Sequence, residues 1–518
     1  MLHGLIEILL SRGKKLFCCF IDYEKAYDRI NRAAVFTKLF KLGVSRKLLN
    51  IMRSMYSNMK LAVKGNDGYF FSHNGLLQGE VCSPILFSLF ISDLEDVLSD
   101  ECNGININDV LMKLLVFADD QALLSGNREG LQKGLQDLEK YCGKWGLKIN
   151  TTKTKIMIFR KGGRVSKKDK WEYKGEAIEI VPCFKYLGCK ISSGGSFSET
   201  TTDLISSARR SLFALKCIFS KNKEILVSTQ MKLFESMILP ILFYGSEVWG
   251  LRKSDNIERF YLAFIKNILC VKSSTPNCFG YGELGLTPLY IRRKVRVVKY
   301  WTKIIDPLCP KPFFVRTIYN ELFTMTTTNP GAVTWASLVK DLLNKCGLGM
   351  YWLSQCVGNV NVFLSIFEQR LNDMYLQDWR EEVDNTSSLR LFKHIKNNIE
   401  FEQYLHIINN EQLRVAITKI RLSSHMFLVE RGRWNTRKLD SSQRVCDLCK
   451  VLEDEFHCLI ICPRFVNERV GCLPERLLNK PNMYQFLHYL NSKDENTLRK
   501  LGMLCSRVMK EYRREQMT

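Results

Sequence analysis

Apolar runs of strand length alternate with amphipathic stretches from about residue 16 to residue 192. The run LFCCFI, Leu16 to Ile21, is continuous and short, which is typical of a strand buried in a sheet. Residues 160–175 are basic and contain glycines, which indicates a loop or hairpin between apolar runs. This alternation predicts one domain that contains both helices and strands.

Helical periodicity dominates the rest of the chain. In TTDLISSARRSLFALKCIFS apolar residues recur at three- and four-residue spacing, and the helical pattern continues to about Ile305. The proline-bearing stretch IIDPLCPKPFF then precedes a second mainly helical segment, which ends near His425. A Cys/His cluster and a charged tail follow. We therefore predict an α+β chain divided into residues 1–192, residues 193–310, a helical connector at residues 311–440, and residues 441–518.

Two adjacent carboxylates interrupt the apolar pattern in KLLVFADDQALLS. We expect a β-hairpin that holds Asp119 and Asp120 at a sheet edge facing solvent. A third carboxylate, Asp22, ends the strand Leu16 to Ile21, and a helix-like stretch follows it. If these strands are neighbours, divalent cations are needed to offset the repulsion, as in two-metal phosphoryl transfer. Turn formation alone is the alternative, because Asp is a common turn residue.

The charge of the chain narrows the choice of partner. Its 518 residues include 76 Lys and Arg against 53 Asp and Glu, a formal charge of +23, which favours polyanions such as nucleic acid. No apolar run approaches the roughly 18 residues of a membrane span, and the N-terminus lacks the pattern of a signal peptide. We expect a protein of the nucleus and cytoplasm, neither secreted nor membrane-bound, whose 19 cysteines are mostly reduced.

Five ordered stretches carry a family resemblance. FIDYEKAYDRI, GLLQGEVCSPILFSLFISDL, FADD, GLKINTTKTKIMIF and FKYLGCKIS follow one another as the palm motifs of reverse transcriptases do. The chain resembles the non-LTR, LINE-type enzymes, and PILFYGSEVWG (Pro240 to Gly250) resembles a thumb segment of Jockey-like members. The resemblance implies a right-hand polymerase palm with partial fingers, a helical thumb and a mainly helical C-terminal region with a small zinc-binding module.

The resemblance also implies the chemistry of the acidic residues. Asp22 and Asp119 match the metal-binding carboxylates, and Asp120 matches the second Asp of the ADD box. They would hold two Mg²⁺ ions, which prefer a few carboxylates plus substrate phosphates. The implied reaction is RNA-directed DNA synthesis on an RNA template, in which the 3′-hydroxyl of a DNA primer attacks the α-phosphate of a dNTP.

Further positions are implied to contact the nucleotide or the primer. Tyr27 matches the bulky gate that excludes a 2′-hydroxyl, and the alternative is a ring that packs a helix. Gln78 and Gly79 match the loop near the incoming nucleotide and template, where Gly79 permits close backbone approach. Lys153 would lie near the triphosphate, or else on a solvated surface. The stretch FKYLG resembles the primer grip, with an ordinary hairpin as the alternative, and its residues are Phe184, Tyr186, Leu187 and Gly188.

A metal site is indicated near the C-terminus by its own chemistry. Cys446 and Cys449 in CDLC are followed by His457 and Cys462, which together are the ligand types of a closed tetrahedral Zn²⁺ site. Cys458 is an alternative ligand, but it adjoins His457 and is expected to face the core. The sequence therefore predicts one Zn²⁺ ion.

A basic stretch precedes this cluster. Arg433, Arg437 and Lys438 lie beside Trp434, which suits backbone contacts and base stacking on RNA. A solvated helix face is the alternative. His425 is either a buried histidine with a partner or a contact, and we assign it no role.

The start of the sequence shapes the expected activity. Only fifteen residues precede the first catalytic strand, where enzymes of this family have finger segments. We expect an N-terminally truncated reverse transcriptase that extends primers poorly, because basic finger residues that clamp the triphosphate are missing. A non-catalytic nucleic-acid-binding remnant of such an element is the alternative. A phosphatase built on Asp22 is disfavoured, because YEKAYD has no second Asp at the required spacing.

Overall fold

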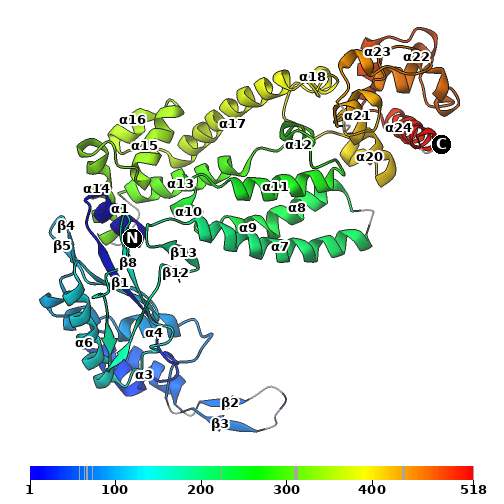
Figure 1. The fold of residues 1–518 in the computed structure, drawn as a ribbon. Coiled ribbons are helices and arrows are strands. Elements are labelled where there is room, and N and C mark those ends of the chain that lie inside the picture. Colours follow the sequence, from blue (N-terminus) through cyan, green and yellow to red (C-terminus); the bar gives the residue numbers. More distant parts are fainter. Residues whose placement is uncertain are drawn as a thin grey trace. The chain divides into compact units, whose positions relative to one another are not determined.

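The protein divides into two compact units (Figure 1). A computed structural model describes residues 1–57, 59–62, 65, 68–72, 74–222, 225–307, 313–434 and 438–516. The first unit consists of Met1–Thr200 and Trp301–Asn344, and the second consists of Thr201–Tyr300 and Lys345–Thr518. Strands and helices mix in the first unit and helices make up the second, which confirms the predicted α+β class. The predicted four-part division stays a prediction.

A five-stranded sheet forms the centre of the first unit. Its strand order is β11-β8-β1-β7-β6, antiparallel except where β11 lies beside β8. The strands are β1 (Leu16–Ile21), β6 (Leu114–Phe117), β7 (Asp120–Ser125), β8 (Lys155–Phe159) and β11 (Glu179–Ile180). All residues of β1 are buried between β7 and β8, as its continuous apolar run predicts. Each buried Leu, Ile or Phe side chain stabilises the fold by about 1.5–3 kcal/mol.

Helices pack on this sheet and join its strands. They are α1 (Leu2–Ser11), α2 (Arg32–Lys41), α3 (Arg46–Tyr56), α4 (Ser83–Phe90), α5 (Leu94–Val97) and α6 (Arg128–Trp145), with the 3₁₀ turn η1 (Asp100–Cys102). Pro84 lies in the first turn of α4, as predicted, where its missing N–H costs no hydrogen bond. The residues after Asp22 form turns until α2 begins, so the helix-like stretch expected there is wrong.

Two-stranded hairpins complete the first unit. They are β2 (Lys60–Ala62) with β3 (Tyr69–Phe71), β4 (Ile105–Ile107) with β5 (Val110–Met112), β9 (Glu172–Tyr173) with β10 (Glu176–Ala177), and β12 (Cys183–Tyr186) with β13 (Cys189–Ser192). The basic stretch at residues 160–175 is a loop followed by strand β9, which pairs with β10, so it forms the predicted loop or hairpin.

Two helices from the middle of the sequence also belong to the first unit. These are α14 (Phe313–Thr328) and α15 (Trp335–Lys345), except that Lys345, the last residue of α15, is assigned to the second unit. Gly4 of α1 lies against Ile318 of α14, close enough that a Cβ at Gly4 would meet a methyl carbon of Ile318 at 2.5 Å. The carboxylate of Glu7 accepts a hydrogen bond of 2.9 Å from the backbone N–H of Trp335. A segment expected to be a connector therefore covers the N-terminal helix.

The second unit is helical. Its helices are α8 (Val227–Met237), α9 (Leu239–Leu242), α10 (Ser246–Trp249), α11 (Asp255–Ile268), α12 (Asn277–Glu283), α16 (Gly349–Ser354), α17 (Val360–Asn385), α18 (Phe392–Ile395), α19 (Tyr404–Ile407), α20 (Glu411–Arg421), α21 (Leu428–Trp434), α22 (Glu475–Asn479), α23 (Met483–Leu490) and α24 (Glu495–Glu515). Short turns lie near its C-terminus: η2 (Ser441–Gln443), η3 (His457–Ile461), η4 (Pro463–Phe465) and η5 (Asn467–Arg469). Two further helices, α7 (Ser198–Lys221) and α13 (Leu289–Ile305), contain residues of both units. The helical periodicity predicted from about Ser196 to Ile305 is confirmed, while the bounds of a separate unit there stay a prediction.

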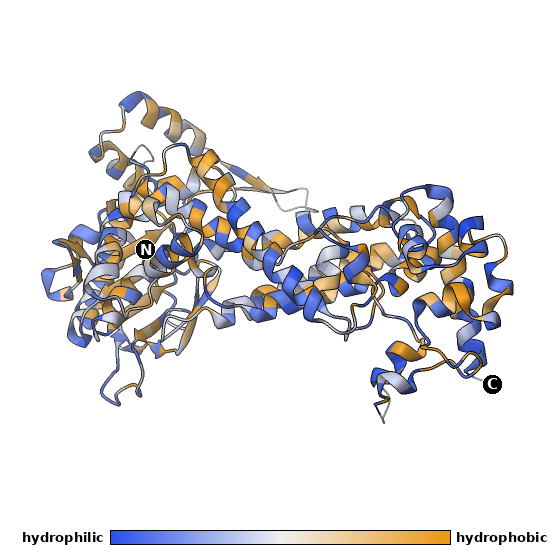
Figure 2. Ribbon diagram, turned by 90° about the horizontal axis from the view of Figure 1, so that it is seen from above, coloured by the Kyte–Doolittle hydropathy of each residue, from blue (hydrophilic) through white to orange (hydrophobic). Residues whose placement is uncertain are grey.

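Burial in the second unit follows the predicted helical period. Both hydrophilic and hydrophobic residues occur along the helices (Figure 2). The buried residues of α17 recur every four positions, from Phe363 to Val383, which gives one narrow apolar stripe. Arg421 of α20 and Glu283 of α12 are fully buried and form an ion pair at 2.6 Å. None of the described helices is long and apolar enough to cross a membrane.

Candidate functional site

The acidic residues gather where β1 ends and β7 begins. Ile21, the last residue of β1, pairs with Gln121 of β7, so Asp22 and Asp120 lie opposite each other on neighbouring strands. Phe117 pairs with Asp120 across the predicted β6–β7 hairpin. Asp119 and Asp120 are exposed, as expected. The fold therefore brings together three carboxylates from stretches about a hundred residues apart.

The turn that joins β6 to β7 and contains Asp119 is strained. Ala118 has φ +52°, in the left-handed region that non-glycine residues seldom adopt. This conformation costs roughly 1–2 kcal/mol for an L-residue. Such strain persists only where the surrounding structure fixes the backbone, and it is frequent at functional sites.

The three carboxylates repel one another electrostatically. Burial raises the pKa of Asp120, and the charges of Asp119 and Asp22 raise it further. Burial also raises the pKa of Asp22, against the opposing effect of Lys153 and with a further contribution from Asp119. A cation at this sheet end would relieve the repulsion.

The segment after α6 fixes the backbone of Asp22. The backbone N–H of Asn150 donates to the carbonyl of Asp22 at 2.8 Å, and the N–H of Asp22 donates to Oγ1 of Thr154 at 3.1 Å. Tyr23 forms an antiparallel bridge with Ile149. Lys153 lies in this turn, exposed, and close enough to Asp22 to lower its pKa. The structure thus brings Lys153 to the acids while leaving it in solvent.

Tyr27 lies beside the same acids. Its ring packs on Phe87 of α4 with centroids 5.2 Å apart. Burial raises the pKa of its hydroxyl, and the charges of Asp119 and Asp120 raise it further. The ring therefore packs on a helix, as the alternative expected, and its hydroxyl lies close enough to Asp119 and Asp120 for their charges to raise its pKa.

The loop before α4 is attached to this segment. The N–H of Leu76 donates to the carbonyl of Tyr27, and that of Gly75 to the carbonyl of Ile30, both at 2.8 Å. Gln78 is exposed and donates to Asp28 at 3.4 Å. Gly79 has φ +88° with open space where a Cβ would lie, so the turn needs glycine and leaves its backbone accessible. The structure brings both residues near Tyr27.

Sequence reasoning missed the residue that anchors this loop. The guanidinium of Arg32 donates to the carbonyls of Tyr56, Ser72, Asn74 and Gly75 and to the hydroxyl of Ser72, at 2.7–3.0 Å. The only signal in the sequence is its position directly after a capping Asn, which says nothing of its partners.

The hairpin of the predicted primer grip packs on the central strand. The rings of Phe184 and Phe20 stack with centroids 4.3 Å apart, and Tyr186 lies 5.1 Å from Phe20. Leu187 and Gly188 form the turn, both with positive φ, as two-residue hairpin loops require. Burial raises the pKa of Tyr186, and the charge of Asp120 contributes to this shift. The hairpin therefore lies next to the acidic sheet end.

The predicted zinc ligands come together in the second unit. The ligand atoms of Cys446, Cys449, His457 and Cys462 all lie within 4.8 Å of one another. The sulfur of Cys462 is 3.9 Å from those of Cys446 and Cys449, and sulfurs that each lie about 2.3 Å from one tetrahedral zinc are about 3.8 Å apart. Cys458 is buried outside this group, as expected.

A π-helical turn makes this ligand set possible. His457 and Cys462 are five residues apart, and on an α-helix they would point about 140° away from each other. In η3 the N–H of Cys462 donates to the carbonyl of His457 at 2.7 Å, which is the i to i+5 bond of a π-helix. Burial lowers the pKa of His457, which favours the neutral imidazole that binds metals. Among the described residues its Nε2 is buried without a hydrogen-bond partner.

The predicted basic stretch is partly used inside the protein. Arg433 donates to the hydroxyl and carbonyl of Ser387 at 3.0 and 2.9 Å and pairs with Glu430 at 3.3 Å. Lys438 is exposed, and Arg437 lies outside the described residues. His425 is buried and bonded to Glu455 at 2.9 Å, so it is a buried histidine with a partner.

The acids and the cysteines suit different metals. Exposed carboxylate oxygens at the sheet end are the hard ligands that Mg²⁺ prefers. Among the described residues these acids do not form a closed group of three ligand atoms as the Cys/His cluster does. Mg²⁺ keeps waters and binds substrate phosphates beside one or two carboxylates. Three sulfurs and one imidazole in a buried, closed set fit Zn²⁺.

Comparison with known proteins matches the part of the chain that carries the acids. Residues 2–191 match the family described as reverse transcriptase (RNA-dependent DNA polymerase). The RNA-directed DNA polymerase from mobile element jockey of Drosophila funebris is 23% identical over 270 residues, 50% of this chain and 29% of the relative.

Two further relatives match this chain with similar identity and coverage. The jockey protein of Drosophila melanogaster is 24% identical over 259 residues, 48% of this chain and 27% of the relative. A Pol polyprotein from retrotransposable element R2 of Popillia japonica is 25% identical over 275 residues, 50% of this chain and 44% of the relative. The matched part thus covers less than half the length of each of these curated relatives.

Proposed function

We propose, from the premise that residues 2–191 are a reverse transcriptase domain homologous to those of non-LTR retrotransposons, that this chain is an RNA-directed DNA polymerase. It would take an RNA template, a DNA primer and dNTPs, and act in the nucleus and cytoplasm. The observation that supports this most strongly is the meeting of Asp22, Asp119 and Asp120 at adjoining strand ends within that domain.

In this proposal the chain's own residues bind and orient the substrates. Asp22 and Asp119 would hold two Mg²⁺ ions, which, when bound, activate the primer hydroxyl and stabilise the charge on the phosphates. The repulsion that raises the pKa of Asp120 supports this, because it shows that the sheet end carries excess negative charge. Lys153, exposed beside Asp22, would meet the triphosphate with a positive charge.

The neighbouring elements would position nucleotide and primer. Tyr27, whose ring packs on Phe87 and whose hydroxyl is affected by the charges of Asp119 and Asp120, would exclude a 2′-hydroxyl. Gln78 and Gly79, on the loop anchored to Tyr27, would approach the nucleotide and template. The β12–β13 hairpin, fixed on Phe20, would position the primer 3′ end. Rigid support of this kind holds reacting atoms in place for the displacement.

The test is primer extension on poly(rA) with an oligo(dT) primer by the purified chain. Asp119→Asn should abolish extension and leave RNA binding nearly unchanged, because it removes one metal ligand at an exposed turn. Asp109→Asn is the matched control: Asp109 is exposed in another hairpin of the same unit, with φ +62°, which Asn tolerates. Equal activity of the two variants would refute the assignment of Asp119.

We also propose that Cys446, Cys449, His457 and Cys462 bind one Zn²⁺. The unpartnered, buried Nε2 of His457 and the sulfur spacing support this ligand set. Burial and the nearby Cys446 raise the pKa of Cys462 to about 12 in the absence of a cation, so a bound metal would be needed to hold the thiolates. The ion would then contribute to the folding of this region.

A further inference from the structure

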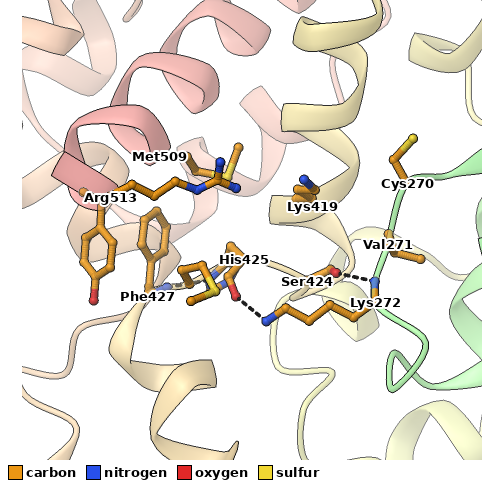
Figure 3. A pocket seen from close by; sticks show the side chains of 11 residues that line it. Cys270, Val271, Lys272, Lys419, Ser424, His425, Phe427, Met509 and Arg513 are labelled. Atoms are coloured by element: carbon orange, nitrogen blue, oxygen red, sulfur yellow. Dashed lines mark hydrogen bonds between the residues drawn. The ribbon is translucent and has the colours of Figure 1, made fainter. Parts of the chain in front are cut away.

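A small pocket in the second unit lies outside both sites described above. It has a volume of about 220 Å³. Lys272 reaches it from the loop after α11, Lys419 from α20, and Arg513 from α24 (Figure 3). None of its lining residues belongs to the reverse transcriptase domain or to the Cys/His cluster. Three segments that are far apart in sequence thus bring three positive charges to one pocket.

None of these three cations forms an ion pair with a carboxylate among the described residues. Among the described residues, neither the ammonium of Lys419 nor the guanidinium of Arg513 makes an ion pair or a hydrogen bond. The ammonium of Lys272 donates to the carbonyl of His425 at 3.1 Å. Burial lowers the pKa of Lys272, the carboxylate of Glu430 opposes this, and the charge of Lys419 adds to it. The pocket therefore holds cations that repel one another.

No carboxylate lines the pocket within the described part of the chain. Glu430, the acid that acts on Lys272, is buried and paired with Arg433. His425 uses its ring to bond Glu455 and offers the pocket only its backbone. Glu430 and Glu455 are thus each paired with another side chain, and the charged residues that line the pocket are positive.

The remaining walls are a hydroxyl and apolar groups. Oγ of Ser424 accepts a hydrogen bond of 3.1 Å from the backbone N–H of Lys272 and leaves its own proton to donate. Val271, Met426, Phe427 and Met509 form an apolar wall beside the cations. The cations and the hydroxyl fit a ligand with several negatively charged oxygens, and the apolar wall fits a nonpolar part of the same ligand.

We propose that the pocket binds one phosphate of a nucleic-acid strand, with the adjoining sugar against the apolar wall. The inference rests on the proposed function for the kind of ligand, since a polymerase handles long polyanions. Lys419 and Arg513 contact the phosphate oxygens, Ser424 donates to one of them, and the bound charge relieves the repulsion between the lysines. The second unit would then contribute to holding template or product.

The test measures binding of a fluorescent single-stranded RNA to the full chain across a range of salt concentrations. The variant Lys419→Gln with Arg513→Gln should bind roughly tenfold more weakly at low salt, because charged hydrogen bonds to a phosphate are lost. Its slope of log affinity against log salt should fall by about 0.7, the value of one phosphate on a single strand. The matched control is Lys393→Gln with Lys510→Gln, which removes the same charge from exposed positions of the same unit.

The outcomes separate this proposal from the polymerase assignment. Equal affinity and equal slope of the two double variants would overturn the pocket, whatever the primer extension. A selective loss in the Lys419 and Arg513 variant would support it even if the chain extends no primer, in which case only the polymerase assignment fails. Free ATP tests the other source of phosphate: ATP binding that the pocket variant loses, with RNA binding unchanged, would overturn the strand assignment.

Discussion

The loop that carries Gln78 and Gly79 depends on one side chain. Arg32 makes hydrogen bonds to four carbonyls and one hydroxyl between Tyr56 and Gly75. Hydrogen bonds to a charged group contribute about 1.5–3 kcal/mol each where water is excluded. These bonds are only partly buried, and water replaces most of them in a variant. We therefore assign about 2 kcal/mol to the loss of the whole set in Arg32→Ala.

This free energy converts to an expected rate. At 1.4 kcal/mol per factor of ten, 2 kcal/mol corresponds to roughly a 30-fold fall in kcat/KM for dTTP. The two backbone bonds from Gly75 and Leu76 remain, so the loop is loosened and not released. Steady-state primer extension on poly(rA) with varied dTTP measures the change. Arg32→Lys should recover little, because one ammonium cannot reach five acceptors with the geometry of a guanidinium.

A neighbouring arginine provides the control. Arg29 lies three residues earlier, is exposed and pairs only with Glu24 at 3.1 Å among the described ion pairs. Arg29→Ala removes the same charge as Arg32→Ala, but the interaction it breaks is a surface ion pair worth about 0–1 kcal/mol. If Arg32→Ala and Arg29→Ala show the same kcat/KM, while both keep the thermal unfolding of the parent, the anchoring role of Arg32 is refuted.

Three further predictions concern charge, metal and packing. Burial and repulsion raise the pKa of Asp22 and Asp120, so both carboxylates should become protonated at a higher pH than an ordinary Asp. As the pH falls through this range, primer extension should decrease, while protonation of these two groups increases the stability of the folded state. Profiles of extension rate against pH and unfolding measured at several pH values test this. Elemental analysis should find one zinc per chain, retained in Cys458→Ala and lost in Cys449→Ser; retention in both would contradict the ligand set. Glu283→Leu should destabilise the second unit by about 3 kcal/mol, because it leaves the fully buried Arg421 with Glu402, at 3.1 Å, as its one remaining carboxylate among the described ion pairs; an unchanged unfolding midpoint would show that the pair matters little.

Local patterns in the sequence were enough for the strands and the ligand types. The continuous apolar run of β1 and the alternation around Asp119 depend only on neighbours along the chain, and both strands form as predicted. The same holds for the helical period of α7 and for the Cys-x-x-Cys pair, whose spacing is short enough for one turn to set. The roles of Tyr27, Lys153 and the primer-grip residues stay predictions.

Contacts between distant segments were decided by the tertiary structure. The packing of α14 and α15 on α1 joins residues that are about three hundred positions apart, and no periodic pattern specifies a partner at that distance. The five acceptors of Arg32 are backbone and hydroxyl oxygens, which every loop offers and only folding selects. The π turn at His457 is likewise absent from any spacing rule, because the i to i+5 bond forms only where packing and a ligand set favour it over the α-helix. Sequence sets which groups are available, but three-dimensional packing decides which of them meet, because the free energy of a long-range contact depends on every element that brings it together.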